Sequence, residues 1–218
     1  MVRQTLIVGL GNPGPEYRDT RHNVGFRVLE AVARDRKTTF ESGGELYREA
    51  VGQGPDGRVT LLAPLTYMNR SGRAVSAWME GQDDLAPCGP EGEAEGVPVR
   101  ILVVCDDLNL PLGSVRLRAR GGSGGQNGLA DILEVLGTEE VCRLRLGIAP
   151  RDGEVEPADW ADFVLKPFMA PERDIVEEMI AHAASACTDW LEHGTEHAAS
   201  RFNRRGITEL DDPEPGAV

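Results

Sequence analysis

Residues 5–26, TLIVGLGNPGPEYRDTRHNVGF, constrain the fold more than any other segment of the chain. The segment opens with Leu6, Ile7 and Val8, an apolar run typical of a buried strand. A stiff loop of glycines and prolines follows at residues 9–15, and an amphipathic helical pattern starts only near Val24. A buried strand that ends in a rigid loop predicts a site at the sheet edge, where the ligands of α/β proteins bind.

The glycines of this loop allow a second interpretation. Gly9, Gly11 and Gly14 match the dinucleotide-binding pattern G-x-G-x-x-G. That pattern needs a helix that starts at the loop, so that its N-terminus faces the pyrophosphate. Here prolines and polar residues through Asn23 intervene, and no acidic residue ends a second strand at the required distance. A nucleotide site is therefore the weaker hypothesis, and a purely structural turn does not explain a His, an Arg and two Asn nearby.

The rest of the chain alternates strand and helix patterns. Turn residues 54–57, Gly-Pro-Asp-Gly, join the first two strands after the N-terminal one and predict a hairpin. Further strands are expected at 45–51, 58–63, 100–105, 115–120 and 144–148. Helices are expected at 24–35, 129–136, 171–193 and 198–203, and one more is expected to start at a cap formed by Ser71. This order predicts a single α/β domain, residues 1–206, with a mixed twisted sheet flanked by helices.

Two acidic segments carry much of the net charge of −13. Residues 81–98 are predicted to be a solvated loop, and residues 207–218 a flexible tail. Arg116, Arg118 and Arg120 form a local basic run that can attract phosphate despite the total charge. Neither a membrane-spanning run nor a signal-peptide pattern is evident, and the four cysteines lack metal-ligand spacing. We therefore expect a cytoplasmic protein without a metal or other cofactor.

Among the four histidines, only His22 closely follows the glycine- and proline-rich loop at residues 9–15. A neutral imidazole can accept a proton from water near neutral pH, which suits general-base catalysis. Asp106 ends the most apolar strand and is the best candidate to orient His22, although a turn or cap residue is the alternative. Asn12, Asn69 and Asn127 follow predicted strands, where amides can hold an ester or merely tolerate a turn.

Residues 121–125, GGSGG, also match the nucleophile elbow G-x-S-x-G. An elbow needs a buried strand directly before it and a catalytic histidine later in the chain. Here Arg118-Ala119-Arg120 precedes the glycines, and the later histidines lie on predicted helices. A serine nucleophile is therefore disfavoured, and the glycines are expected to let backbone amides approach a ligand.

Several blocks resemble the bacterial-type peptidyl-tRNA hydrolase family. These blocks are GLGNPGPEYRDTRHNVGF at 9–26, LTYMNRSG at 65–72, DDLNLPLG at 106–113, GGQNGL at 124–129, RLRLGI at 143–148 and DFVL at 162–165. They occur in the family's order, and such a series is far more specific than any one block. The family pattern has His where this chain has Gln126, which can form hydrogen bonds but cannot change charge.

The resemblance implies hydrolysis of the ester bond of peptidyl-tRNA by a monomer that acts in translation without a cofactor or an obligate protein partner. It implies that His22 is the base, that Asp106 supports it, and that Asn12 contacts the peptide part. It assigns substrate or tRNA contacts to Tyr17, Tyr67, Asn69, Asn127, Arg118 and Arg145, and makes Met68 part of the wall. The alternative is a non-catalytic RNA-binding accessory protein of the same fold.

Overall fold

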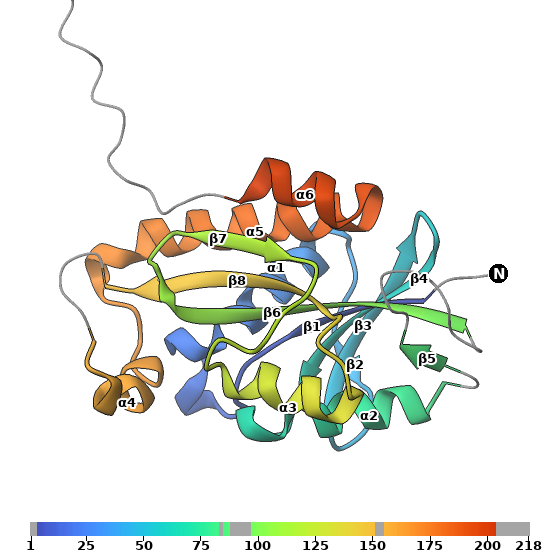
Figure 1. Cartoon of the computed structure of the whole chain (residues 1–218), viewed down its shortest axis with the longest axis horizontal. Coiled ribbons are helices and arrows are strands. Elements are labelled where there is room, and N and C mark those ends of the chain that lie inside the picture. The colour runs from blue at the N-terminus through green and yellow to red at the C-terminus, as the bar shows by residue number, and fades with distance from the viewer. Residues whose placement is uncertain (1–3, 83–84, 88–96, 151–154, 204–218) are drawn as a thin grey trace, which may run out of the picture.

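The predicted N-terminal strand is β1, Gln4–Gly9, and it lies in the middle of an eight-stranded sheet (Figure 1). The computed structural model describes residues 4–82, 85–87, 97–150 and 155–203. The strands follow the order β2-β3-β4-β1-β6-β8-β7, and β5 pairs with β6 outside this path. Their bounds are β2 Glu41–Ser42, β3 Tyr47–Gly54, β4 Gly57–Pro64, β5 Leu85–Pro87, β6 Val97–Pro111, β7 Val115–Arg118 and β8 Cys142–Ala149.

The sheet is mixed, as predicted. β1 runs parallel to β4 and β6, and β6 runs parallel to β5 and β8. The hairpin of β3 and β4 is antiparallel, as are the pairs β2 with β3 and β7 with β8. The parallel centre brings the carboxyl ends of β1 and β6 together, in the register of Gly9 with Val104. This is the edge at which the polar residues after each strand meet.

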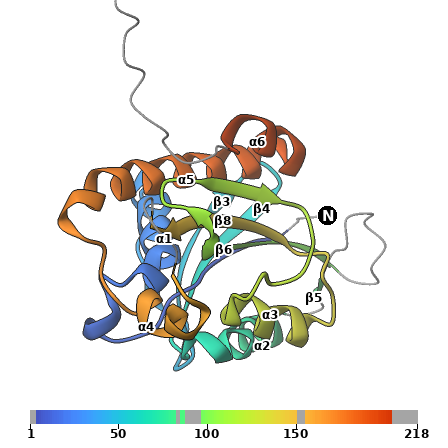
Figure 2. The same ribbon diagram turned by 60° about the vertical axis from the view of Figure 1, so that its left-hand side comes forward.

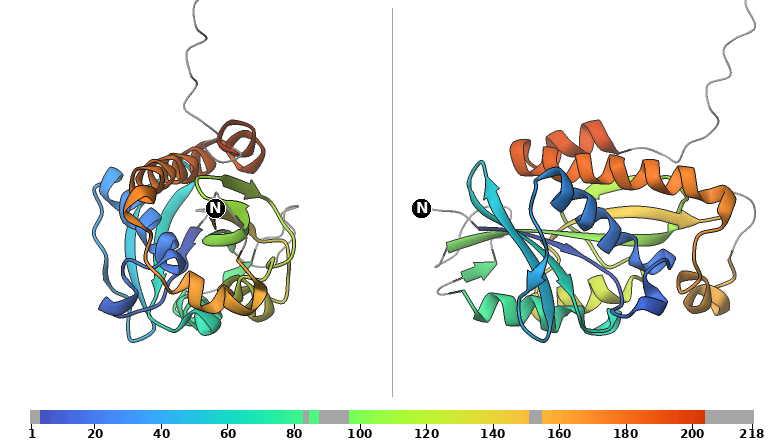
Figure 3. Two further views of the ribbon diagram at one scale, coloured as in Figure 1. Left: turned by 90° about the vertical axis from the view of Figure 1, so that its left-hand side faces the viewer. Right: turned by 180° about the vertical axis from the view of Figure 1, so that it is seen from behind.

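Helices cover both faces of the sheet (Figures 2 and 3). One face packs against α1 Val24–Asp35, α5 Arg173–His193 and α6 Thr195–Phe202, and the other against α2 Ser71–Glu80 and α3 Asn127–Leu136. Each face has its own apolar cluster, so the sheet is buried on both sides. The short α4, Trp160–Val164, follows β8. Among the described helices, none is long and apolar enough to span a bilayer.

Gly25 lets α1 pack closely on the strand ends. A Cβ atom at this position would lie 2.5 Å from both the Leu10 nitrogen and the Val104 oxygen. Only glycine permits that approach without a shift of the backbone. Because His22 precedes α1 by a single turn, η2 Arg21–Asn23, the same close packing fixes where His22 lies.

Three sequence predictions are corrected. The segment 81–98 is not a continuous loop, because β5 pairs with β6 inside it and β6 begins at Val97; residues 83–84 and 88–96 lie outside the described part. β6 does not end at Asp106 and Asp107 but continues to Pro111 through an irregular register. Ser71 does not cap α2; it is the first helical residue, and its hydroxyl donates to the Met68 carbonyl.

The C-terminal helix closes one edge of the sheet. α6 lies beside the edge strand β7 (Figure 1). Directly after α6, the Asn203 side chain accepts a hydrogen bond from the Leu117 nitrogen at 2.6 Å and donates to the Leu117 oxygen at 3.4 Å. The end of the described chain is thereby fastened to the sheet.

Candidate active site

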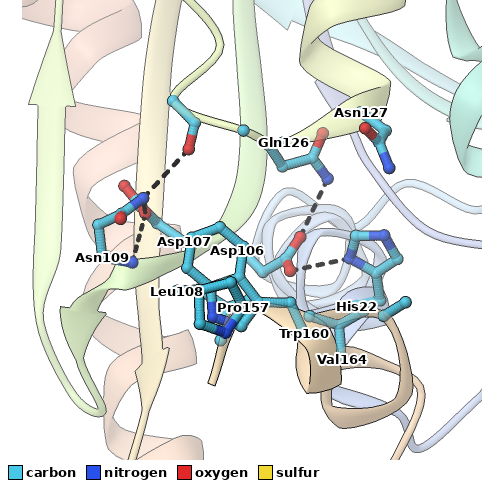
Figure 4. Close-up of a pocket in the computed structure, with 13 residues that line it drawn as sticks. His22, Asp106, Asp107, Leu108, Asn109, Gln126, Asn127, Pro157, Trp160 and Val164 are labelled. Carbon is cyan, nitrogen blue, oxygen red and sulfur yellow. Dashed lines mark hydrogen bonds and ion pairs between the residues drawn. The ribbon is translucent and has the colours of Figure 1, made fainter. Parts of the chain in front are cut away.

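His22 and Asp106 meet at the carboxyl edge of the parallel strands. The Nδ1 atom of His22 lies 2.8 Å from Oδ2 of Asp106, and both residues are buried (Figure 4). A carboxylate can only accept, so this bond places the proton of the neutral imidazole on Nδ1. The lone pair is then on Nε2, which lies on the side of the ring away from Asp106. His22 is therefore oriented to accept a proton.

The neighbouring Arg21 fixes the backbone at His22. Its guanidinium forms an ion pair with Glu172 at 2.7 Å and lies 4.4 Å from the centre of the Phe163 ring. It also donates to the Pro167 carbonyl. These partners all belong to the segment that contains α4 and the start of α5. The segment that carries His22 is thus fastened to the α4 region, which forms one wall of the site.

Gln126 supports the second oxygen of Asp106. Its Nε2 donates to Asp106 Oδ1 at 3.0 Å and lies 3.2 Å from the sulfur of Met68. Its Oε1 accepts from the Leu129 nitrogen at 2.7 Å and so caps α3. The capping bond fixes the orientation of the amide, because its oxygen faces the helix and its nitrogen faces the carboxylate. Gln126 therefore holds Asp106 without adding a titratable group.

A cavity of about 290 Å³ opens beside His22 and Asp106. Its walls come from the end of β6, the glycine loop before α3, and the α4 region (Figure 4). The exposed amide of Asn127 and the indole of Trp160 both line this space. The remaining lining residues are Asp107, Leu108, Asn109, Gly124, Gly125, Gln126, Pro157, Ala161 and Val164. A small space lined by both polar and apolar side chains, beside an oriented imidazole, can hold an ester and a water molecule.

The other predicted amides and aromatic residues lie outside this cavity's lining. Asn12 Oδ1 accepts a hydrogen bond from the Met68 nitrogen at 2.8 Å, so Asn12 holds the chain that leads into η3, Met68–Arg70. Asn12 lines a second hollow of about 520 Å³. Asn69 and Tyr67 are exposed, and Tyr17 is half-buried. The structure therefore brings His22, Asp106, Gln126 and Asn127 together at this cavity. The other predicted residues, Asn12, Tyr17, Tyr67 and Asn69, do not line it.

Of the two arginines expected to contact phosphate, only Arg118 is freely exposed, on β7. Arg145 forms an ion pair with Asp107 at 3.1 Å and donates to the Gly122 carbonyl at 2.8 Å. A Cβ at Gly124, whose φ is +64°, would lie 2.6 Å from the Arg145 guanidinium. Arg145 thus holds the glycine loop against β6 and β8.

Arg143 reinforces the same loop from inside the protein. Its buried guanidinium donates to the carbonyls of Gly121 and Gly122, and to the carbonyl of Val141. Burial, together with the positive charge of Arg145, lowers the pKa of Arg143. The conformation of the loop therefore depends on two arginines of β8.

Comparisons with known proteins agree with this geometry. The profile of the peptidyl-tRNA hydrolase family matches residues 6–210. The chain belongs to the peptidyl-tRNA hydrolase family. A peptidyl-tRNA hydrolase from Chlorobaculum parvum is 42% identical over 204 residues, which cover 91% of this chain and 97% of the relative. One from Chlorobium phaeobacteroides is 44% identical over 203 residues, covering 92% and 98%.

Solved peptidyl-tRNA hydrolases share the fold. The crystal structure of the Acinetobacter baumannii protein superimposes with a TM-score of 0.78 at 32% identity and covers 94% of this chain and 97% of its own. A crystal structure of a peptidyl-tRNA hydrolase in complex with N-propanol gives a TM-score of 0.79 at 32% identity, with coverage of 95% and 98%. The predicted α/β fold and the predicted family are both confirmed.

The two competing motifs lack the structure that their chemistry needs. After the loop that contains Gly9, Gly11 and Gly14, two short 3₁₀ turns intervene and α1 starts only at Val24. The helix therefore does not begin at the loop itself, as the dinucleotide-binding motif requires. Ser123 follows the exposed Arg120 rather than a buried strand, and it lies outside the cavity's lining.

Sequence reasoning missed several wall residues in this family member. Asn109 donates from its side chain to Asp107 Oδ1 at 2.9 Å and to the Gly124 carbonyl at 3.1 Å, and so joins β6 to the glycine loop. Trp160 faces the cavity from α4, and its indole N–H donates to the Val155 carbonyl at 2.9 Å. The only sequence signal for Trp160 was a large aromatic residue in a polar stretch, which does not identify its partner.

Proposed function

We infer that this chain hydrolyses the ester bond between a peptide's carboxyl group and the 3′ ribose of tRNA. Membership of the peptidyl-tRNA hydrolase family supports this substrate and reaction. The single observation that carries the proposed mechanism is the hydrogen bond between His22 Nδ1 and Asp106, beside an open cavity. Such a pair supplies a base for water without a covalent nucleophile.

In the proposed reaction, Nε2 of His22 takes a proton from water while the water oxygen forms a bond to the ester carbonyl carbon. Asp106 stabilises the imidazolium that results. Neutral donors, with Asn127 the nearest candidate, stabilise the oxyanion. The intermediate collapses as the bond from carbon to the ribose oxygen breaks, and the imidazolium returns its proton to that oxygen. The products are a peptide acid and a tRNA with a free 3′-terminal hydroxyl.

The test is release of peptide from N-blocked aminoacyl-tRNA, with unblocked aminoacyl-tRNA as the substrate control. His22→Ala is expected to lower turnover by about 10²- to 10⁴-fold, the usual contribution of general-base catalysis, while tRNA binding persists. Asp106→Asn is expected to lose less, because the imidazole remains. Ser123→Ala is the matched control and should remain active. Full hydrolysis by His22→Ala would overturn the mechanism.

The same assay distinguishes the proposed enzyme from the alternative, a non-catalytic RNA-binding protein of the same fold. An accessory RNA-binding protein would bind tRNA but release no peptide, even with the wild-type sequence. No observation on the molecule favours this alternative, since His22 and Asp106 form a complete pair next to an open cavity.

We also propose finer assignments around the site. In this proposal the exposed Tyr67 and the half-buried Tyr17 stack on unpaired bases of the acceptor end. Asn12 contacts the peptide part of the substrate, and Asn69 holds water and the acceptor end. The exposed Arg118 and the half-buried Arg145 are proposed to contact phosphate.

We further propose that the protein acts as a monomer in the cytoplasm. In this proposal the functional domain comprises residues 1–206, and residues 207–218 are an acidic tail. The free thiols of Cys105, Cys142 and Cys187 suit a reducing compartment.

A further inference from the structure

A second cluster of titratable side chains lies where α5 meets α6. The Asp189 carboxylate is almost fully buried, with its side chain 7% exposed, and it faces two imidazoles. Nδ1 of His193 lies 3.3 Å from Oδ1 of Asp189, and Nδ1 of His197 lies 2.8 Å from Oδ2. The proposed hydrolytic mechanism uses none of these residues.

The local fold explains why the three residues meet. Asp189 and His193 lie one turn apart on α5, so they share a face of the helix. Gly194, with φ of +82°, ends α5 and lets the chain reverse into α6. The reversal stacks the His197 ring against that of His193, with 4.5 Å between their centroids. The sequence suggested only surface histidines here, because the reversal is not visible in the spacing.

The donor set is one carboxylate oxygen and two imidazole nitrogens, which together suit zinc and similar divalent transition metals. One ligand atom from each residue lies within 4.8 Å of the others, so small side-chain rotations can close the site around an ion. The two imidazoles are each about half exposed, which leaves a coordination position open to water.

We propose that Asp189, His193 and His197 form a binding site for zinc or a similar divalent transition-metal ion.

One cation already competes for this carboxylate. The Nη1 atom of Arg201, on α6, lies 2.7 Å from Asp189 Oδ1, and the Arg201 side chain is 58% exposed. A mostly exposed guanidinium can turn into solvent when a metal ion takes its place.

The site is remote from the hydrolytic cavity. Trp190, next to Asp189, packs under the Arg100 guanidinium near the start of β6, whereas His22 faces the other end of that strand. Figure 1 shows the α5–α6 junction at the opposite end of the molecule from α4. Bound metal would join α5 to α6, and so would strengthen the attachment of α6 to β7.

The test uses the full, untagged chain after removal of metals with a chelator. Titration with zinc chloride at pH 7.5 should show one saturable site by calorimetry, and cobalt chloride should give the visible absorption bands of a low-coordinate nitrogen–oxygen site. Loss of a supporting group around a metal typically costs 10- to 100-fold in affinity, so His193→Ala and His197→Ala should each lose at least about tenfold. Arg201→Ala should instead tighten binding, because it removes the competing cation.

His182→Ala is the matched control, because His182 lies on α5 but outside the cluster, where its Nε2 donates to the Phe202 carbonyl at 2.9 Å. Its metal affinity should equal that of the wild type. Two results would overturn the proposal: no saturable zinc binding by the wild type, or binding that survives combined replacement of His193 and His197. The cobalt spectrum of the wild type decides the question even if a variant fails to fold.

Discussion

The two carboxylate oxygens of Asp106 accept hydrogen bonds from two different groups. The imidazole of His22 can change charge, and the amide of Gln126 cannot. Gln126 therefore acts on His22 only through Asp106. A hydrogen bond to a charged group contributes about 1.5–3 kcal/mol. Gln126→Leu is expected to lower kcat on the order of tenfold, because Asp106 loses a hydrogen bond and stabilises the His22 imidazolium less well.

The control for Gln126 is Gln126→His, which retains a ring donor and should recover most of the lost turnover. Gln126→Leu also removes the cap of α3, which should cost about 1 kcal/mol in the free energy of unfolding. A variant with the expected loss of stability but unchanged kcat would show that Gln126 serves the helix alone.

For single residues, the sequence predicted that His22 and Asp106 form a pair but did not predict the side chains that surround them. The pair was visible because each residue follows a strongly apolar strand or a rigid loop. The bond from Gln126 to Asp106 was not, because it depends on where the glycine loop folds back over β6. Asn12 was expected to contact the peptide part of the substrate. Its amide oxygen also accepts from the Met68 backbone, a contact between distant parts of the chain that sequence spacing cannot reveal.

Among the structural elements, β7 presents exposed arginines to solvent while its alternate residues enter the core. Arg118→Ala is expected to weaken tRNA binding without lowering kcat, and to reduce the slope of log K against log salt by roughly 0.7 if its partner is a single-stranded phosphate. Arg34→Ala, at an exposed arginine of α1, is the matched control. Equal salt slopes in both variants would contradict the assignment.

Arg145→Ala should behave differently from Arg118→Ala. Arg145 holds Asp107 and the Gly122 carbonyl, so its loss should disturb the glycine loop and lower kcat as well as binding. An unchanged kcat in Arg145→Ala would show that the loop does not depend on this residue.

The core face of α5 makes stability depend on pH in the alkaline range. Burial raises the pKa of the Cys187 thiol from 9.0 to about 12. Above about pH 9 the unfolded chain releases this proton while the folded chain retains it, so stability falls as pH rises. Between pH 8 and 10.5 the wild type should lose about 2 kcal/mol more than Cys187→Ala, measured by urea unfolding. Parallel losses in the two proteins would refute this contribution.

The elements that the sequence predicted well are those with long apolar or helical patterns, such as β1, α1 and α5. β5 was missed because Leu85–Pro87 is only three residues long and lies in a segment rich in glycine, proline and acids. The far end of β6 was missed because polar residues and an irregular register continue the strand past Asp107. Tertiary pairing, not local propensity, decides both cases.

For the whole molecule, the proposed domain boundary gives a direct prediction. A chain that ends at residue 206 retains α6 and the contact of Asn203 with Leu117. We expect its unfolding midpoint and kcat to match those of the full chain. Loss of the acidic residues beyond 206 should strengthen tRNA binding at low salt and have little effect at high salt, because exposed charges are screened. A lower unfolding midpoint would place the boundary further along the chain.

Asn203 has a wider consequence for how the molecule meets its neighbours. An edge strand exposes peptide groups that can pair with a strand from another copy. On β7 the Asn203 amide occupies the N–H and C=O of Leu117, as a peptide of an adjoining strand would. The opposite edge, β2, is only Glu41–Ser42, too short to template a long partner. Among the described strands, the path from β2 to β7 therefore ends in a two-residue strand and in a strand whose Leu117 peptide groups are bonded to a side chain. Both features discourage the pairing of these two edges with strands of other copies.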